Sequence, residues 1–219
     1  MSIIKELTSY EAVPYDLAKR LGPAGINLVI DIMWLSYHDL VKDRAISERH
    51  DENEITQKWF AKIQARWVDD TSIRVDYRLQ PIQQYVDSTL AKPKGAKPTI
   101  DFCFYSYDHA ESYFGAECKI LIKGDTAKYN RYIDTGLKNY LNGRYSSNCS
   151  TAALVGYVIG QGLFEIIAEI KKRVNFNCIT REMYRNDRRD EPHYNSWHMR
   201  SLDNCEINIH HLFFTFCAD

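Results

Sequence analysis

The chain has 219 residues, of which 45% are hydrophobic and 26% are charged, and its net charge is −1. This composition excludes a disordered chain and fits one large globular domain with a substantial core. The near-neutral charge also excludes a global basic field, so any phosphate-binding surface must come from local clustering of basic residues.

The termini and the cysteines indicate the cellular compartment. Six cysteines contain no C-x-x-C pair, and several lie in strongly apolar runs. The N-terminus, M-S-I-I-K-E-L-T, lacks an apolar core of signal-peptide length. The longest apolar stretch, residues 151–167, is interrupted by Gln161 and Glu165 and is too short and too polar to span a bilayer. We therefore expect a cytoplasmic protein with reduced thiols and no membrane partner.

The first half of the chain predicts helices followed by strands. Residues 1–45 form a predicted helical preface, in which apolar residues recur at helical spacing after the break at Gly22-Pro23. A second helix is predicted from residue 51 to residue 68. After a loop at 91–99, the segments I-D-F-C-F-Y-S-Y and Y-F-G-A-E-C-K-I-L-I predict two antiparallel strands.

The second half returns to alternating helices and strands. Asp125 or Thr126 caps a helix that is predicted to run to residue 141, and A-A-L-V-G-Y-V-I-G predicts a strand buried on both faces. A basic-ended helix follows, then an irregular polar segment at 175–205 and a closing strand, E-I-N-I-H-H-L-F-F-T-F. This order predicts a single α/β domain over 1–219, with a mixed sheet flanked by helices, a core at 51–160 and a C-terminal part at 161–219.

Two carboxylates and a lysine interrupt the two otherwise apolar strands. Residues i and i+2 of a strand point to the same face, so Glu117 and Lys119 project side by side. If Phe102 and Phe104 pack one way, Asp101 points the other, and antiparallel pairing can bring it beside Glu117. Two carboxylates make a hard oxygen site of the kind that Mg²⁺ prefers. A neighbouring ammonium can position or polarise an attacking water.

The segment Pro98-Thr99-Ile100-Asp101, followed after a turn by Glu117-Cys118-Lys119, resembles the Asp…Glu-x-Lys signature of the PD-(D/E)XK nuclease superfamily. The helix and the buried strand that follow the site also match the αβββαβ order of this superfamily, whose fold many restriction endonucleases share, and the resemblance covers roughly residues 51–160. The Pro-Asp dipeptide of the signature is not intact here. The resemblance implies a restriction-endonuclease-like fold and a Mg²⁺- or Mn²⁺-dependent nuclease. In that nuclease Asp101 and Glu117 hold the metal and Lys119 orients or activates the water.

The Glu-x-Lys triplet alone is weak evidence, because Glu169-Ile170-Lys171 repeats it. This second copy lies on a predicted helix, where residues i and i+2 do not face each other, and no strand-borne Asp precedes it. The alternative for the first copy is an ordinary hairpin salt bridge. That alternative explains less well why charges interrupt two apolar strands, since burying a charge is costly unless it is paired or metal-bound.

An acidic residue from the preceding helix often completes the site in this superfamily. Apolar residues at positions 55, 59, 63 and 67 define the core face of the second helix. Glu52 lies on that stripe, three residues before Ile55, whereas Glu54 points to the far side. Glu52 is therefore the candidate for a fourth catalytic residue and further metal ligand. The alternative is a partner for the helix dipole.

Basic residues and tyrosines interleave after the candidate site. Lys128, Arg131, Tyr132 and Arg144 are the expected nucleic-acid contacts, because basic side chains can follow phosphates while tyrosines stack or hydrogen-bond. The alternative is an ordinary amphipathic helix with Tyr132 in the core. A second basic stretch at 171–200 is either a loop that covers the substrate or an ordinary solvated loop.

Histidines and cysteines near the C-terminus offer further ligands. Cys178, His193, His198 and Cys205 could ligate zinc, but their spacing matches no common pattern. His193 or His198 could instead approach the candidate site from a loop. His210 and His211 are successive in a predicted strand, so one of them points inward, where a histidine is more often a core residue than a ligand.

The resulting hypothesis is a metal-dependent endonuclease that acts on nucleic acid, with DNA favoured over RNA, in bacterial restriction or anti-phage defence. What the superfamily commonly does suggests a helicase or ATPase partner subunit and a homodimer. The main alternative is a non-catalytic nucleic-acid-binding or assembly subunit that retains the fold.

Overall fold

A computed structural model describes residues 16–86, 98–108, 112–177 and 179–216. The helical segments of this part are α1 (Leu17–Lys42), α2 (Glu52–Asp69), η1 (Ser72–Asp76), α3 (Thr126–Arg131), η2 (Tyr132–Leu137), α4 (Lys138–Leu141) and α5 (Leu163–Val174). The strands are β1 (Leu79–Val86), β2 (Thr99–Ser106), β3 (Tyr113–Leu121), β4 (Thr151–Ile159), β5 (Ile179–Arg185), β6 (His193–Met199) and β7 (Glu206–Phe216).

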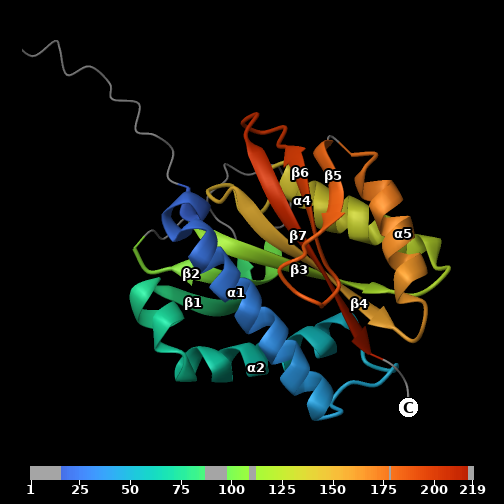
Figure 1. Cartoon of the computed structure of the whole chain (residues 1–219), viewed down its shortest axis with the longest axis horizontal. Helices are drawn as coiled ribbons and strands as arrows, with labels where there is room; N and C mark the ends of the chain where they lie inside the picture. The colour runs from blue at the N-terminus through green and yellow to red at the C-terminus, as the bar shows by residue number, and fades with distance from the viewer. Residues whose placement is uncertain (1–15, 87–97, 109–111, 178, 217–219) are drawn as a thin grey trace, which may run out of the picture.

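The strands form one sheet that lies between two layers of helices. Helices α1 and α2 cover one face, and α3, η2, α4 and α5 cover the other (Figure 1). The strand order is β1-β2-β3-β4-β7-β6-β5. The three central strands β3, β4 and β7 run parallel, while the other neighbouring pairs are antiparallel. The mixed sheet flanked by helices that the sequence predicts is therefore confirmed.

Burial explains the central position of the parallel strands. Strands that carry helices on both sides read as continuous apolar runs, and β4 is buried over nearly its whole length. This confirms the predicted doubly buried strand at A-A-L-V-G-Y-V-I-G. Free energy from apolar burial on both faces therefore stabilises the centre of the sheet, where β3 carries part of the candidate site.

Aromatic contacts fix helix α2 against the sheet. Trp59 is fully buried, and its ring meets those of Phe102 and Phe214 edge-on, with centroids 4.9 and 4.8 Å away. Its indole N–H donates to the carbonyl oxygen of Met33 at 3.2 Å, which joins α2 to α1. Edge-to-face contacts between large aromatic rings fix the relative orientation of the rings and also bury them. The first turn of α2 is therefore held at one place over β3.

Helix α1 lies within the predicted helical preface at 1–45, of which residues 1–15 lie outside the described residues, and α2 matches the predicted second helix. Helix α1 contains the Gly22-Pro23 break as a kink, at which Gly22 has φ 62° and ψ 179°. A positive φ of this kind is readily adopted by glycine. The chain therefore changes direction there, and α1 consists of two helical pieces joined at this kink. None of the helices in the described residues combines the length and apolar character that a membrane-spanning segment needs.

Two parts of the chain organisation differ from the sequence analysis. Strand β1 was not predicted; it is an edge strand, where Pro81 costs no internal sheet hydrogen bond. The prediction of an irregular segment at 175–205 is wrong, because it contains β5 and β6. Polar residues hide these strands: Asn195 of β6, for example, donates to Asn208 of β7 at 3.0 Å. Hydrophobic alternation therefore does not reveal them.

Candidate active site

The β2–β3 hairpin brings Asp101 to the Glu117–Lys119 segment. The antiparallel pairing ends with Phe102 opposite Ala116. Beyond that pair, Asp101 Oδ2 accepts a hydrogen bond from the backbone N–H of Cys118 at 2.7 Å. The predicted proximity of Asp101 to this segment is therefore confirmed, and the bond holds its carboxylate where β2 and β3 separate.

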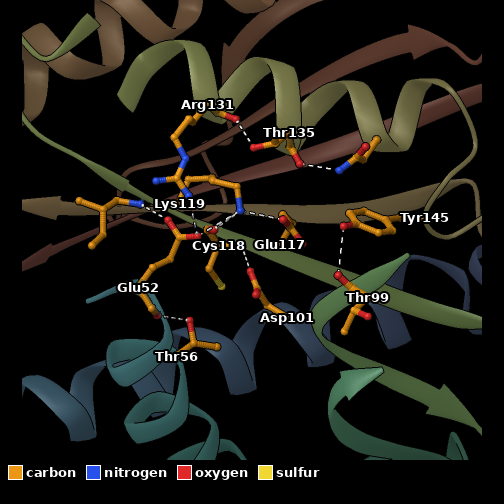
Figure 2. A network of polar contacts seen from close by, with 12 residues as sticks. Glu52, Thr56, Thr99, Asp101, Glu117, Cys118, Lys119, Arg131, Thr135 and Tyr145 are labelled. Atoms are coloured by element: carbon orange, nitrogen blue, oxygen red, sulfur yellow. Dashed lines mark hydrogen bonds and ion pairs between the residues drawn. The ribbon is translucent and has the colours of Figure 1, made fainter. Parts of the chain in front are cut away.

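The ammonium group of Lys119 lies close to oxygen atoms from two elements, β3 and α2. Lys119 Nζ donates to Glu117 Oε1 and to the carbonyl oxygen of Cys118, each at 2.7 Å. Glu52 Oε1, from α2, lies 3.3 Å from the same nitrogen. Figure 2 shows these groups together with Asp101. The side-by-side arrangement of Glu117 and Lys119 that strand geometry predicts is present.

Helix α2 contributes Glu52 and not Glu54. Asp51 is the N-cap, and Glu54 is used in the capping box, where its side chain accepts from the Asp51 N–H at 2.9 Å. Glu52 points to the sheet instead, and its Oε2 accepts from the backbone N–H of Ile120 at 3.0 Å. Helical phase predicts that Glu52 and not Glu54 faces the sheet, and this placement is confirmed. The role of Glu52 stays a prediction.

Burial governs the ionisation of the cluster. Glu117 and Lys119 are each only 5% exposed. Burial, together with the neighbouring Asp101 carboxylate, raises the pKa of Glu117 to about 8. Burial also raises the pKa of Asp101. Burial disfavours the charged form of Lys119, but the carboxylates of Glu117, Asp101 and Glu52 outweigh it and raise the lysine pKa. Lys119 is therefore an ammonium at neutral pH.

The acids of the cluster exceed the cations that neutralise them. Three carboxylates surround Lys119, and the further cation, Arg131, lies 3.7 Å from Glu52 with 54% of its side chain exposed. Glu117 Oε2 is buried and has no hydrogen-bond partner among the described residues. A buried acceptor without a partner is costly. A proton on Glu117, which its raised pKa favours, or a bound cation would satisfy this oxygen.

Oxygen donors of this kind fit Mg²⁺ or Mn²⁺. The unpartnered Glu117 Oε2 is the atom at which such an ion would relieve the cost of burial. Within the described ranges, however, no three His, Cys, Asp or Glu side chains are arranged to hold a metal ion. Lys119 explains this, because its ammonium is hydrogen-bonded to Glu117 and Glu52 and keeps their carboxylates on either side of it.

The predicted nucleic-acid contacts fall into two groups. Arg131 and Arg144 are exposed and Lys128 is half-buried. The prediction for Tyr132 is wrong: its side chain is fully buried, and its hydroxyl donates to the Leu154 carbonyl at 3.2 Å. A phenol enclosed between helix and sheet cannot reach a polynucleotide, so the core interpretation of Tyr132 is correct.

The two arginines lie on different segments of the chain after the site. Arg131, on the helix above the site, faces Glu52 (Figure 2). Arg144 precedes Tyr145, whose hydroxyl donates to the carbonyl of Thr99 at 3.1 Å at the start of β2.

The predicted roles of the C-terminal histidines are not supported. His193 and His198 lie on β6, which β4 and β7 separate from β3. His193 Nε2 lies 2.9 Å from His210 Nδ1, and His198 Nε2 lies 2.7 Å from Ser196 Oγ. They therefore serve polar networks of the sheet, not the candidate site. Of the other proposed zinc ligands, Cys205 is exposed and Cys178 lies outside the described residues.

These buried histidines predict sensitivity to acid. Burial lowers the pKa of His193 to about 2 and that of His210 to about 4. The folded chain keeps them neutral while the unfolded chain takes up protons below a pH of about 6.5, at up to about 1.4 kcal/mol per pH unit for each histidine. The stability that the neutral histidines contribute is therefore complete above that pH and is lost as the pH falls. Urea unfolding should show that the free energy of unfolding falls less between pH 7.5 and pH 5 for His210→Asn than for the unmodified chain. Equal losses would contradict this expectation.

No protein-family model, curated protein or solved structure matches this chain. An inference about its function therefore depends on the geometry and chemistry of the residues in the site.

Proposed function

We propose that this protein is a metal-dependent nuclease that hydrolyses phosphodiester bonds in nucleic acid, with DNA favoured over RNA. The observation that carries the proposal is the convergence of Glu52 from α2, Asp101 from β2, and Glu117 with Lys119 from β3 on one buried cluster. A simple hairpin salt bridge would need only Glu117 and Lys119. It would not require two further carboxylates whose charge has to be compensated.

The order of the elements supports a restriction-endonuclease-like fold as part of this proposal. Helix α2 precedes the antiparallel strands β1, β2 and β3, and a helical segment then leads to β4, which pairs parallel to β3. The four candidate residues lie on the early elements of this unit. Asp101 and Glu117, with Glu52, would hold Mg²⁺ or Mn²⁺, and the bound ion would neutralise charge on the phosphate and polarise it for attack.

Lys119 can bind and orient oxygen atoms but cannot act as a base in its resting state. Its raised pKa keeps it protonated, so it donates hydrogen bonds and accepts none. An ammonium in a buried position also interacts more strongly with a developing negative charge than one in water. We therefore assign Lys119 to the orientation of the attacking water and to the stabilisation of the phosphate. Arg131, Arg144 and Lys128 would contact the neighbouring phosphates of the strand.

The test is cleavage of plasmid DNA, single-stranded DNA and RNA in the presence of Mn²⁺ or EDTA. We expect cleavage that requires Mn²⁺ and that is lost in Asp101→Ala, because this variant removes one of the two strand-borne carboxylates. Circular dichroism and the melting temperature of the variant serve as the control for folding. Full activity of a folded Asp101→Ala variant, or cleavage by the unmodified chain in EDTA, would contradict the proposal.

The second candidate is a non-catalytic nucleic-acid-binding or assembly subunit. The observation that favours it is the closed ion pair of Lys119 with Glu117, which satisfies one carboxylate oxygen without any metal. Calorimetric titration with Mg²⁺ and Mn²⁺ separates the candidates: binding that depends on Glu117 supports the nuclease, and its absence supports the subunit. Either proposal is compatible with a helicase or ATPase partner, with a role in defence and with a homodimer.

A further inference from the structure

Cys118, the residue between Glu117 and Lys119, is joined to the rest of the cluster through its backbone. Its N–H donates to Asp101 Oδ2, and its carbonyl oxygen accepts from Lys119 Nζ, both at 2.7 Å. One residue therefore holds an acid on one side and the ammonium on the other. Its side chain, which is fully buried, points into the core between the sheet and helices α1 and α2.

Buried polar groups also join the sheet to α2. Tyr157, whose side chain carries a phenol hydroxyl, lies on β4 opposite Ile120 of β3. The oxygen of that hydroxyl lies 3.0 Å from Thr56 Oγ1, and Thr56 donates to the backbone carbonyl of Glu52 at 2.8 Å. The side chains of Thr56 and Tyr157 are 3% and 0% exposed. Figure 2 shows Thr56 directly beside Glu52.

The number of hydroxyl protons fixes which group donates in each of these hydrogen bonds. Thr56 has one hydroxyl proton and donates it to Glu52, so Tyr157 must donate to Thr56. The hydroxyl protons of Thr56 and Tyr157 are then both used, as a buried polar network in an apolar core requires. The bond from Thr56 to Glu52 is common within helices, but the link through Tyr157 to the sheet is a tertiary contact.

We propose that Tyr157 and Thr56 are positioning residues that hold the first turn of α2 against β4 and thereby fix Glu52 relative to Glu117 and Lys119 of the neighbouring strand. The carboxylate of Glu52 is held at its tip by Ile120 N–H. The hydrogen bonds from Tyr157 to Thr56 and from Thr56 to the carbonyl oxygen of Glu52 hold its backbone. A side chain that is fixed at both ends keeps its position when the charge around it changes, which a preorganised site needs. The assignment to a catalytic site rests on the nuclease proposed above.

The first test measures Mn²⁺ binding by calorimetry. Tyr157→Phe removes only a hydroxyl and keeps the ring that packs against Trp59 and Phe216. We expect Tyr157→Phe and Thr56→Val to weaken Mn²⁺ binding about tenfold, and Thr56→Ser to restore it. The matched control is Tyr37→Phe, which removes a hydroxyl of the same core that donates to Thr215 on β7, and which should bind Mn²⁺ normally.

Dependence on Glu52 distinguishes positioning from a general loss of stability. In a Glu52→Gln background, Tyr157→Phe should weaken Mn²⁺ binding no further. The same weakening in both backgrounds, or none in the unmodified one, would overturn the inference. If the unmodified chain binds no Mn²⁺, the proposed nuclease function fails, and a second measurement decides on positioning.

That second measurement is a double-mutant cycle in the melting temperature, which needs no activity. Because Tyr157 and Glu52 are joined through Thr56, the losses caused by Tyr157→Phe and Glu52→Gln should deviate from additivity by about 2 °C or more. Additive losses would overturn the positioning role whether or not the chain is a nuclease.

Discussion

Glu117→Gln is expected to abolish metal-dependent cleavage while making the metal-free fold more stable. The substitution keeps the shape of the side chain and the oxygen that accepts from Lys119, but it removes a buried negative charge that lies near Asp101. We expect kcat to fall by at least about 10³-fold, the scale seen when one essential group of an active site is removed. In EDTA, the free energy of unfolding should rise by at least about 1 kcal/mol at pH 8.

The pH dependence of this difference follows from the raised pKa of Glu117. Burial raises that pKa from 4.5 to about 8, so the folded chain keeps a proton that the unfolded chain releases. The contribution of Glu117 to stability is therefore complete below pH 4.5 and is lost as the pH rises towards 8. The advantage of Glu117→Gln over the unmodified chain should grow across this interval and should vanish at the acid end.

The second Glu-x-Lys triplet provides a matched control for this experiment. Glu169 lies on α5 in an ion pair with Arg173, with 46% of its side chain exposed. Glu169→Gln makes the same chemical change at a solvated position, so it should alter neither cleavage nor stability appreciably. A Glu117→Gln variant that cleaves as well as the Glu169→Gln control would contradict the assignment of Glu117 as a metal ligand.

Lys119→Met is expected to destabilise the fold strongly. The substitution keeps an apolar stem of similar length but removes the ammonium that the carboxylates of Glu52, Asp101 and Glu117 share. Removing one partner from a buried ion pair leaves an uncompensated charge and costs about 3–5 kcal/mol. Urea denaturation at pH 8 in EDTA measures this loss as a lower midpoint with an unchanged slope.

A compensating substitution makes this prediction specific. Because the cost comes from unpaired carboxylates, the double variant Lys119→Met/Glu117→Gln should recover part of the loss, whereas Lys171→Met on α5 should cost little at its exposed position. If Lys119→Met were as stable as Lys171→Met, the carboxylates would not need the ammonium, and the charge imbalance inferred for the cluster would be wrong.

The parts of the site that follow from local periodicity could be predicted from the sequence. Strand alternation places Glu117 and Lys119 side by side, and helical phase selects Glu52 over Glu54; both depend on positions within one element. The buried strand at 151–159 and the helix that begins at Glu52 follow from the same kind of pattern.

The parts that depend on contacts between distant elements could not be predicted. Tyr132 has the composition of a binding residue, but the packing of η2 against β4 decides that it is buried. The hydrogen bond between Tyr157 and Thr56 joins residues 101 positions apart, and no local pattern indicates it. Strands β5 and β6 were missed because β5 is a mostly exposed edge strand and β6 buries polar side chains that are hydrogen-bonded within the sheet, so neither shows a clear hydrophobic pattern.

The two outer strands limit how copies of this chain can associate. An exposed sheet edge is a template for the strand of another molecule unless proline, charge or irregular pairing blocks it. On β1 the edge contains Pro81, and on β5 the sequence I-T-R-E-M-Y-R places charged residues along an edge whose pairing to β6 has register shifts. Growth of the sheet from one molecule into the next is therefore disfavoured at both ends. A dimer that aligned two active sites would have to form through helices or loops.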